Sequence, residues 1–302
     1  MTSRRYKIVG LGELLWDLLP AGKQLGGAPA NFAYISTLLG NEGIVASRLG
    51  CDPLGDEAAR QLSAVGVNAD SIQRDTSHPT GTVRVEVDAA GQPKFEIGEG
   101  VAWDYLEWTS AWEKLAAEAD AVCFGSLAQR ADVSRATIRK FVSIARKGAV
   151  RVFDVNLRQS FYSKEVLTES IQVSDIVKLN HEELPRIMEL FGVPHRDEIA
   201  SAESLVERYQ LKMICVTRGC RGSLLIRDRT VNEHPGYRVR VADTVGAGDA
   251  FTAGLVREYL RRAPLAAINE SANRVGAWVA SNAGAMPVPG SAGLERELAV
   301  IE

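Results

Sequence analysis

The chain has 302 residues, of which 46% are hydrophobic and 24% charged, a composition typical of a globular protein with a large buried core. Its 35 basic and 38 acidic residues give a formal net charge of -3, and this balance excludes a nucleic acid or another polyanion as an expected partner.

The sequence carries no membrane or export signal that we recognise. Residues 1–12 (MTSRRYKIVGLG) contain only a short apolar run without a cleavage site, and no apolar window reaches the roughly 18 residues of a membrane span. The four cysteines, Cys51, Cys123, Cys215 and Cys220, lack the spacing of metal ligands. We therefore expect a cytoplasmic protein with reduced thiols and without zinc or haem.

Short apolar runs alternate with amphipathic segments along the chain. The apolar runs span 6–12, 43–50, 120–126, 150–156, 175–180 and 212–219, and helical periodicity appears at 29–40, 54–66, 132–148 and 201–210. Several runs are apolar at nearly every position, which suits strands covered on both faces. The pattern predicts an α/β fold over residues 1–302, with a mostly parallel central sheet and helices on both faces.

Residues 80–103 break this rhythm. Val83, Val85 and Val87, and then Phe95 and Ile97, alternate with polar residues around a turn at 88–93, which predicts a two-stranded antiparallel ribbon. Residues 13–25 could add strands to it. We expect segments 14–25 and 79–103 to form a lid over a substrate, a partner chain, or both, and the exposed strand edges suggest a homodimer.

Polar residues follow the apolar runs where ligands bind in open α/β sheets, outside the carboxyl ends of the strands. These residues are Glu13, Asp17, Ser126, Gln129, Asp154, Asn156, Arg158, Asn180, Glu183, Thr217, Arg218 and Gly219. Each one alone could form a turn or cap a helix, but together they predict one crevice along one sheet edge.

Two glycine clusters precede predicted helices. In DTVGAGDAFTAGL (243–255), small residues would let an anion approach the first N–H groups of a helix that extends toward Pro264, with Asp249 in its first turn. In LGGAPANFA (25–33), Gly27 and Asn31 could hold a polyhydroxylated ligand, with Asp17 as a further acceptor. The alternative for Asp249 is that it only caps the helix, and the alternative for residues 25–33 is a tight loop with a helix cap.

Two nucleotide-binding motifs are excluded. VGLGELL (9–15) begins like a dinucleotide fingerprint but has Leu15 in place of the third glycine, and the chain contains no P-loop motif.

Residues 26–40 (GGAPANFAYISTLLG) and 243–255 together resemble the two signatures of the PfkB (ribokinase-like) carbohydrate kinases. FDVNLR (153–158), LNHEE (179–183), VTRGCRG (216–222) and NRVGAWVASNAGAMPVP (273–289) are similar to family segments in the family's order. Within the family, the chain is most similar to fructokinases in four short segments: GE (12–13), WD (16–17), LGGAPAN (25–31) and FDVNLR (153–158). Ala28 stands where ribokinases carry a lysine, which counts against ribose.

The resemblance implies a three-layer ribokinase-like fold and transfer of the γ-phosphate of ATP to a primary sugar hydroxyl, with fructose giving fructose 6-phosphate. It implies that Asp249 is the general base and that the N–H groups of Gly246, Ala247 and Gly248 bind the transferring phosphate. The remaining implied residues are Asp17, Gly27, Ala28, Asn31, Asn156 and Arg158 for the sugar; Asn180, Thr217, Gly219, Gly222, Gly248 and Asn273 for the nucleotide; Asn180 and Glu183 for Mg²⁺ through water; and Asp243, Val245 and Gly284 for K⁺.

Some alternatives stay open. The segment after Phe95 lacks an arginine common in fructokinases, and Arg130 and Arg158 at the sugar end would suit 2-keto-3-deoxygluconate; a nucleoside is a further alternative, and Arg130 could instead be ion-paired. Trp16 and Trp103 either line the sugar site or pack the lid. A non-catalytic sugar-binding relative is disfavoured by the intact Asp249 motif. Because Asp249 would lie at a helix N-terminus, we expect its pKa to be low.

Overall fold

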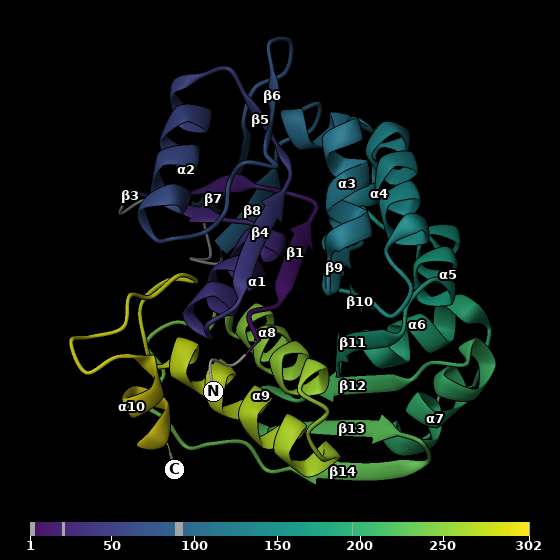
Figure 1. The fold of residues 1–302 in the computed structure, drawn as a ribbon. Coiled ribbons are helices and arrows are strands. Elements are labelled where there is room, and N and C mark those ends of the chain that lie inside the picture. Colours follow the sequence, from purple (N-terminus) through teal and green to yellow (C-terminus); the bar gives the residue numbers. More distant parts are fainter. Residues whose placement is uncertain (1–3, 20–21, 88–92, 195, 302) are drawn as a thin grey trace.

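The computed structural model describes residues 4–19, 22–87, 93–194 and 196–301, and an eight-stranded sheet forms its centre (Figure 1). The strand order is β14-β13-β12-β11-β10-β9-β1-β4; β13 is antiparallel to its neighbours β12 and β14, and the other adjacent strands are parallel. The strands are β1 (Lys7–Leu11), β4 (Glu42–Ala46), β9 (Ala121–Gly125), β10 (Val150–Asp154), β11 (Ile176–Asn180), β12 (Met213–Thr217), β13 (Ser223–Arg227) and β14 (Thr230–His234). Each predicted apolar run contributes a strand to this sheet, and the mostly parallel arrangement is confirmed.

Helices cover both faces of the sheet (Figure 1). Buried side chains of α1 (Ala28–Leu38), α2 (Pro53–Ala64), α8 (Ala247–Leu260), α9 (Leu265–Ala280) and α10 (Leu294–Ala299) belong to one apolar cluster. Those of α3 (Ser110–Glu118), α4 (Asp132–Ile144), α5 (Lys164–Gln172), α6 (Glu183–Phe191) and α7 (Glu198–Tyr209) belong to the other. The predicted three-layer α/β fold is therefore confirmed.

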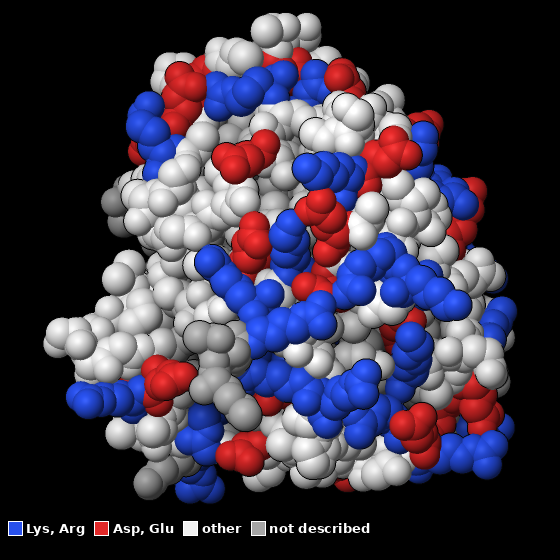
Figure 2. Space-filling model, in the orientation of Figure 1, with Lys and Arg blue, Asp and Glu red and all other residues white. Residues whose placement is uncertain are grey.

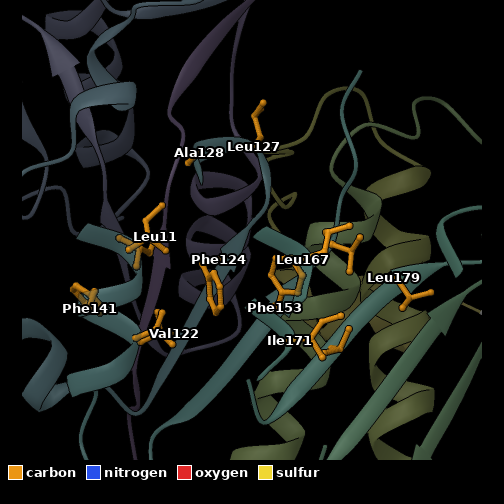
Figure 3. Close-up of a cluster of buried hydrophobic side chains, with 14 of the residues drawn as sticks. Leu11, Val122, Phe124, Leu127, Ala128, Phe141, Phe153, Leu167, Ile171 and Leu179 are labelled. Atoms are coloured by element: carbon orange, nitrogen blue, oxygen red, sulfur yellow. The ribbon is translucent and has the colours of Figure 1, made fainter. Parts of the chain in front are cut away.

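Alternation along the strands separates the two clusters. In β9, Val122 and Phe124 contribute to the cluster beneath α3–α7, whereas Ala121 and Cys123 face the α8 layer. Figure 3 shows Phe124 beside Phe153 of β10, with their ring centroids 5.3 Å apart. The same alternation directs Asp154 and Lys178 toward the α8 layer, because their neighbours Phe153 and Leu179 belong to the opposite cluster.

A second, four-stranded sheet has the order β3-β2-β7-β8. It combines β2 (Leu15–Leu19), β3 (Gly22–Gly26), β7 (Gly81–Val87) and β8 (Pro93–Ile97), with β7 and β8 antiparallel and Val83 opposite Ile97. This confirms the predicted ribbon and the strands added near the start; most of the predicted turn lies outside the described residues. A two-stranded sheet of β5 (Arg48–Gly50) and β6 (Gln73–Asp75) lies nearby, and the 3-10 helices are η1 (Ala102–Tyr105), η2 (Leu127–Gln129) and η3 (Gly219–Arg221).

The helix ends follow the sequence signals. Pro29 lies in the first turn of α1, and Gly40 follows that helix with a φ of +85°. Helix α8 ends at Leu260, and Pro264 caps the next helix, α9. Both predicted boundaries are confirmed.

Basic side chains gather across the middle of the face shown in Figure 2. Several basic residues of the chain pair with two buried carboxylates at the amino ends of strands: Arg4 and Arg146 with Asp120, and Arg151 and Lys212 with Asp175. Among the described residues, no helix combines the length and apolar character needed to cross a bilayer.

Candidate active site

The amino end of helix α8 lies against the carboxyl ends of β10 and β11. Gly246 caps this helix with a φ of +76°, and a β-carbon there would lie 2.6 Å from the Ala285 side chain, so the turn requires glycine. The Ala247 N–H donates to the Thr244 carbonyl at 3.3 Å within the turn. The first amides of a helix lack intrahelical acceptors, which makes this end a suitable place for an anion.

An ion pair lies beneath the helix start. Lys178 Nζ is 3.0 Å from both carboxylate oxygens of Asp154, and the two residues face each other in the register of β10 and β11. The Thr252 hydroxyl lies 2.9 Å from the Gly248 carbonyl and 3.2 Å from Asp154 Oδ2. Burial alone would lower the pKa of Lys178, but Asp154 and other nearby carboxylates raise it, so the side chain is a fixed cation.

Asp249 lies in the first turn of α8, and Asn31 Nδ2 donates to its Oδ2 at 2.8 Å. Burial and the neighbouring Asp154 raise the pKa of Asp249 to about 6, although Lys178, Asn31 and Arg158 act in the opposite direction. The expected low pKa is therefore wrong, because desolvation and a second carboxylate outweigh the helix dipole. Asp249 is thus ionised at neutral pH and is a stronger base than an exposed aspartate.

A cavity of about 780 Å³ opens between this helix end and the four-stranded sheet. All six residues predicted for the sugar line this cavity: Asp17, Gly27, Ala28, Asn31, Asn156 and Arg158. The amino end of α8 contributes Gly246, Gly248 and Asp249 to the same lining. Leu15, Leu19, Val83 and Ile97 from the small sheet supply an apolar wall.

Gly27 adopts a φ of +111° at the start of α1. A β-carbon at this position would lie 2.5 Å from the Glu13 carbonyl oxygen, so a larger residue would push α1 away from the strand end. Since α1 carries Asn31, Gly27 sets the distance between the Asn31 amide and Asp249.

Of the residues predicted for the nucleotide, Gly248 lines this cavity, and the others do not. Thr217, Gly219 and Gly222 belong to the end of β12 and the turn that leads to β13. Asn273 on α9 is buried, and its Nδ2 donates to Ser223 Oγ at 2.7 Å and to Asn269. Its side chain therefore connects α9 to β13.

Asn180 and Glu183 bind each other at the start of α6. Asn180 Oδ1 accepts from the Glu183 N–H at 2.8 Å, and the two carboxylate oxygens of Glu183 accept from the N–H groups of Asn180 and Leu157, each at 2.8 Å. Both carboxylate oxygens thus already accept a backbone amide, which leaves lone pairs for water ligands of a metal. Within the described part of the chain, no three His, Cys, Asp or Glu side chains cluster as a metal site.

Asp243 joins the residues predicted for a monovalent cation. Its Oδ1 accepts from Val245 N at 3.0 Å and its Oδ2 from Gly284 N at 3.2 Å. The carboxylate therefore holds the loop before α8 against the loop after α9.

Several strand-end residues serve the fold instead of the cavity. Arg130 forms a buried ion pair with Asp104 and stacks over Trp103, so it does not face the sugar end. Trp16 and Trp103 are buried and are not among the residues that line the cavity. Ser126 forms a hydrogen bond with Val155, and Gln129 forms hydrogen bonds with Gly125 and Ser170. Arg218 forms ion pairs with Glu198 and Glu233.

Two charged residues of the site have roles that the sequence reasoning missed. Lys178 lies inside an apolar run that predicts a strand covered on both faces. A lysine in such a strand indicates that an oppositely charged residue is buried beside it. Glu13 was recognised only as a strand-end residue; its side chain is 3% exposed and lines the cavity.

The chain is similar to known sugar kinases. The chain is 32% identical over 301 residues to an uncharacterized sugar kinase of Pyrococcus horikoshii, covering 93% of this chain and 92% of the relative. The structure of that kinase in complex with ATP has a TM-score of 0.80 at 31% identity, over 97% of this chain and 99% of the other.

Fructokinases are also similar to this chain. A fructokinase of Escherichia coli is 32% identical over 265 residues, which cover 83% of each chain. The Vibrio cholerae fructokinase structure with fructose, ADP and calcium has a TM-score of 0.81 over 98% of both chains, but at 23% identity it bears on the fold alone. Residues 20–290 match the model of the pfkB family carbohydrate kinases. The chain therefore belongs to this family and is an ATP-dependent sugar kinase, a phosphotransferase with an alcohol group as acceptor.

Proposed function

We propose that this kinase is a fructokinase, which transfers the γ-phosphoryl group of ATP to the primary hydroxyl of fructose and forms fructose 6-phosphate. The observation that carries the proposal is the position of Asp249 at the cavity, with its carboxylate fixed by Asn31 and adjoining the amino end of α8. A sugar hydroxyl in the cavity would meet a base and an anion-binding helix end together.

In the proposed reaction, the sugar oxygen attacks the γ-phosphorus and its proton passes to Asp249. The new bond is O–P, and the bond between the γ-phosphorus and the β,γ-bridging oxygen breaks, with ADP as the leaving group. Amides of Gly246, Ala247 and Gly248 would receive the charge of the transferring group. The Lys178 ammonium lies about 3.0 Å from where a β-carbon of Gly248 would stand, so it adds positive charge below the same place.

The charges at the cavity favour a neutral sugar over 2-keto-3-deoxygluconate. The lining includes four carboxylates, those of Glu13, Asp17, Asp243 and Asp249, and two cations, Arg158 and Lys178. Lys178 is already paired with Asp154, so carboxylates exceed the cations free to bind an acidic substrate. Burial raises the pKa of Asp17 to about 6, against the opposing effect of Arg158, so Asp17 is still largely ionised at neutral pH. Carboxylates accept hydrogen bonds from sugar hydroxyls and repel an acidic substrate.

The relatives support the same substrate. The E. coli relative, at 32% identity, is named a fructokinase.

We further propose that Mg²⁺ accompanies ATP. Asn180 and Glu183 would hold it through water, because Mg²⁺ keeps several waters and the oxygens of Glu183 retain lone pairs beyond their backbone hydrogen bonds. The bound ion would supply positive charge to the phosphate oxygens. Thr217, Gly219, Gly222 and Asn273 remain proposed for the nucleotide, and Asp243, Val245 and Gly284 for K⁺.

The four-stranded sheet, within segments 14–25 and 79–103 of a single domain, is the proposed lid, since it supplies one wall of the cavity. Its edge strand β3 is largely exposed and suits a homodimer through the lid. Sedimentation that finds only monomer at micromolar concentration would remove the dimer.

Release of ADP across fructose, tagatose, ribose, 2-keto-3-deoxygluconate and nucleosides, with Mg-ATP present, tests the substrate. The proposal expects the highest kcat/KM with fructose. Preference for 2-keto-3-deoxygluconate or for a nucleoside would replace fructose.

A further inference from the structure

Glu13 presents an unpaired carboxylate oxygen next to the cavity. It follows strand β1, its side chain is 3% exposed, and its Oε2 has no hydrogen-bond partner among the described residues. Buried polar atoms without a partner are rare in native proteins, because their lost hydration is not replaced. When such an atom lies at a functional site, the missing partner is expected to be a ligand.

A second unpaired acceptor lies at the same cavity. Asn31 donates through Nδ2 to Asp249, whereas its buried Oδ1 has no partner in the described part of the chain. Glu13 and Asn31 both line the cavity, together with Asp17 and Asp249. Two unpaired acceptor atoms at one cavity favour a ligand rich in hydroxyl donors.

The surroundings hold Glu13 in place. The Glu13 carbonyl packs against Gly27, where no β-carbon would fit, and the backbone amides of Glu13 and Ala28 interact with the carboxylate. Burial and Asp249 raise the pKa of Glu13 to about 7, while these amides and Arg158 lower it. The unpaired Oε2 of Glu13 can accept a hydroxyl hydrogen bond. Asp249, and not Glu13, lies in the first turn of α8, so the role of base is proposed for Asp249 alone.

We propose that Glu13 is a specificity residue whose Oε2 accepts a hydrogen bond from one sugar hydroxyl other than the one phosphorylated, and so fixes the orientation of the sugar before Asp249. The proposal rests on the fructokinase function proposed above. A site built to bind a hydroxyl strongly rejects the analogue that lacks it, since its buried acceptor then remains unpaired.

The test compares wild type and Glu13→Gln by ADP release with fructose and with fructose analogues that each lack one hydroxyl. We expect kcat/KM for fructose to fall at least about tenfold in the variant, with an unchanged KM for ATP. The fall should recur with every analogue except one, for which the two proteins perform equally because the hydroxyl that Glu13 binds is absent. Glu207→Gln, an exposed glutamate on α7, is the matched control and should leave all values unchanged.

Thermal unfolding checks the fold, and Glu13→Gln should melt no lower than wild type. Glu13→Met is the second variant if the amide fails to fold, with the same expected kinetics. Equal losses with every analogue, or an unchanged kcat/KM for fructose, would overturn the role of Glu13 while leaving the fructokinase function in place. Absence of ADP release by wild type with fructose and all of its analogues would overturn both proposals.

Discussion

Asn31 donates a hydrogen bond of 2.8 Å to Asp249 although 218 positions separate the two residues in the chain. One lies on α1 and the other on α8, and these helices pack together on the same face of the sheet. The bond stabilises the charged form of Asp249 against the burial that raises its pKa. The two glycine-rich motifs thus meet at one cavity.

Activity should decline in acid as Asp249 is protonated. With a pKa of about 6, Asp249 is a base above that pH and loses this form below it, so kcat/KM should fall about tenfold per pH unit below about pH 6. Asp17, with a pKa also raised to about 6, would steepen the decline. Initial rates from pH 4.5 to 8 measure this, and a flat profile down to about pH 4.5 would show an unperturbed carboxylate.

Asn31→Ala should move that pH profile. Without the amide, the charged form of Asp249 loses a hydrogen bond, so its pKa rises and the acid limb shifts to higher pH. We expect kcat/KM at pH 7 to fall at least about tenfold. A lower plateau with an unmoved acid limb would mean that Asn31 acts only on the sugar.

Lys178→Met should destabilise the fold. It would leave Asp154 buried without its cation, a change expected to lower the free energy of unfolding by about 3–5 kcal/mol. Lys212→Met is the control, since this lysine is 60% exposed and its partner Asp175 keeps Arg151; we expect a loss below about 1 kcal/mol there. Urea unfolding measures both, and equal losses would contradict the account.

Glu13→Gln should stabilise the empty protein in a pH-dependent way. The pKa of Glu13 is raised from 4.5 to about 7 on folding, so its ionisation destabilises the fold progressively between these pH values and by a constant amount above them. The variant should gain roughly 3 kcal/mol at pH 8 and little at pH 4. Urea unfolding of both proteins at pH 4 and pH 8 measures this gain. An equal change in the free energy of unfolding at both pH values would mean that titration of Glu13 does not affect stability.

The sequence predicted the strands, the small sheet and the crevice because apolar runs and glycine motifs are local signals. Asp154 and Lys178 show where local signals end. Their pairing depends on the register of β10 against β11, which no short motif encodes. β13 and β14 were not predicted either; their tight turn at Asp228 and Arg229 uses two residues with positive φ that are neither glycine nor asparagine.

The chemistry of individual residues was harder to predict than their position. Asp249 was correctly placed in the first turn of a helix, but its pKa depends on burial and on Asp154, which only the folded structure brings near. Arg130 follows a strand as a ligand residue would, yet the fold directs it to Asp104. Sequence spacing predicts which residues lie at the carboxyl ends of the strands. Packing determines which of their side chains reach the cavity.

Replacement of Asp249 by Asn tests the central claim most directly, because it removes the base and keeps the shape and the hydrogen bond from Asn31. The measurements are kcat from ADP release with fructose and Mg-ATP, and fructose affinity by calorimetry. We predict that kcat falls at least about a hundredfold, while fructose affinity changes less than about threefold. A kcat within about tenfold of wild type, or an equal loss of binding and turnover, would contradict the role of Asp249 as the general base.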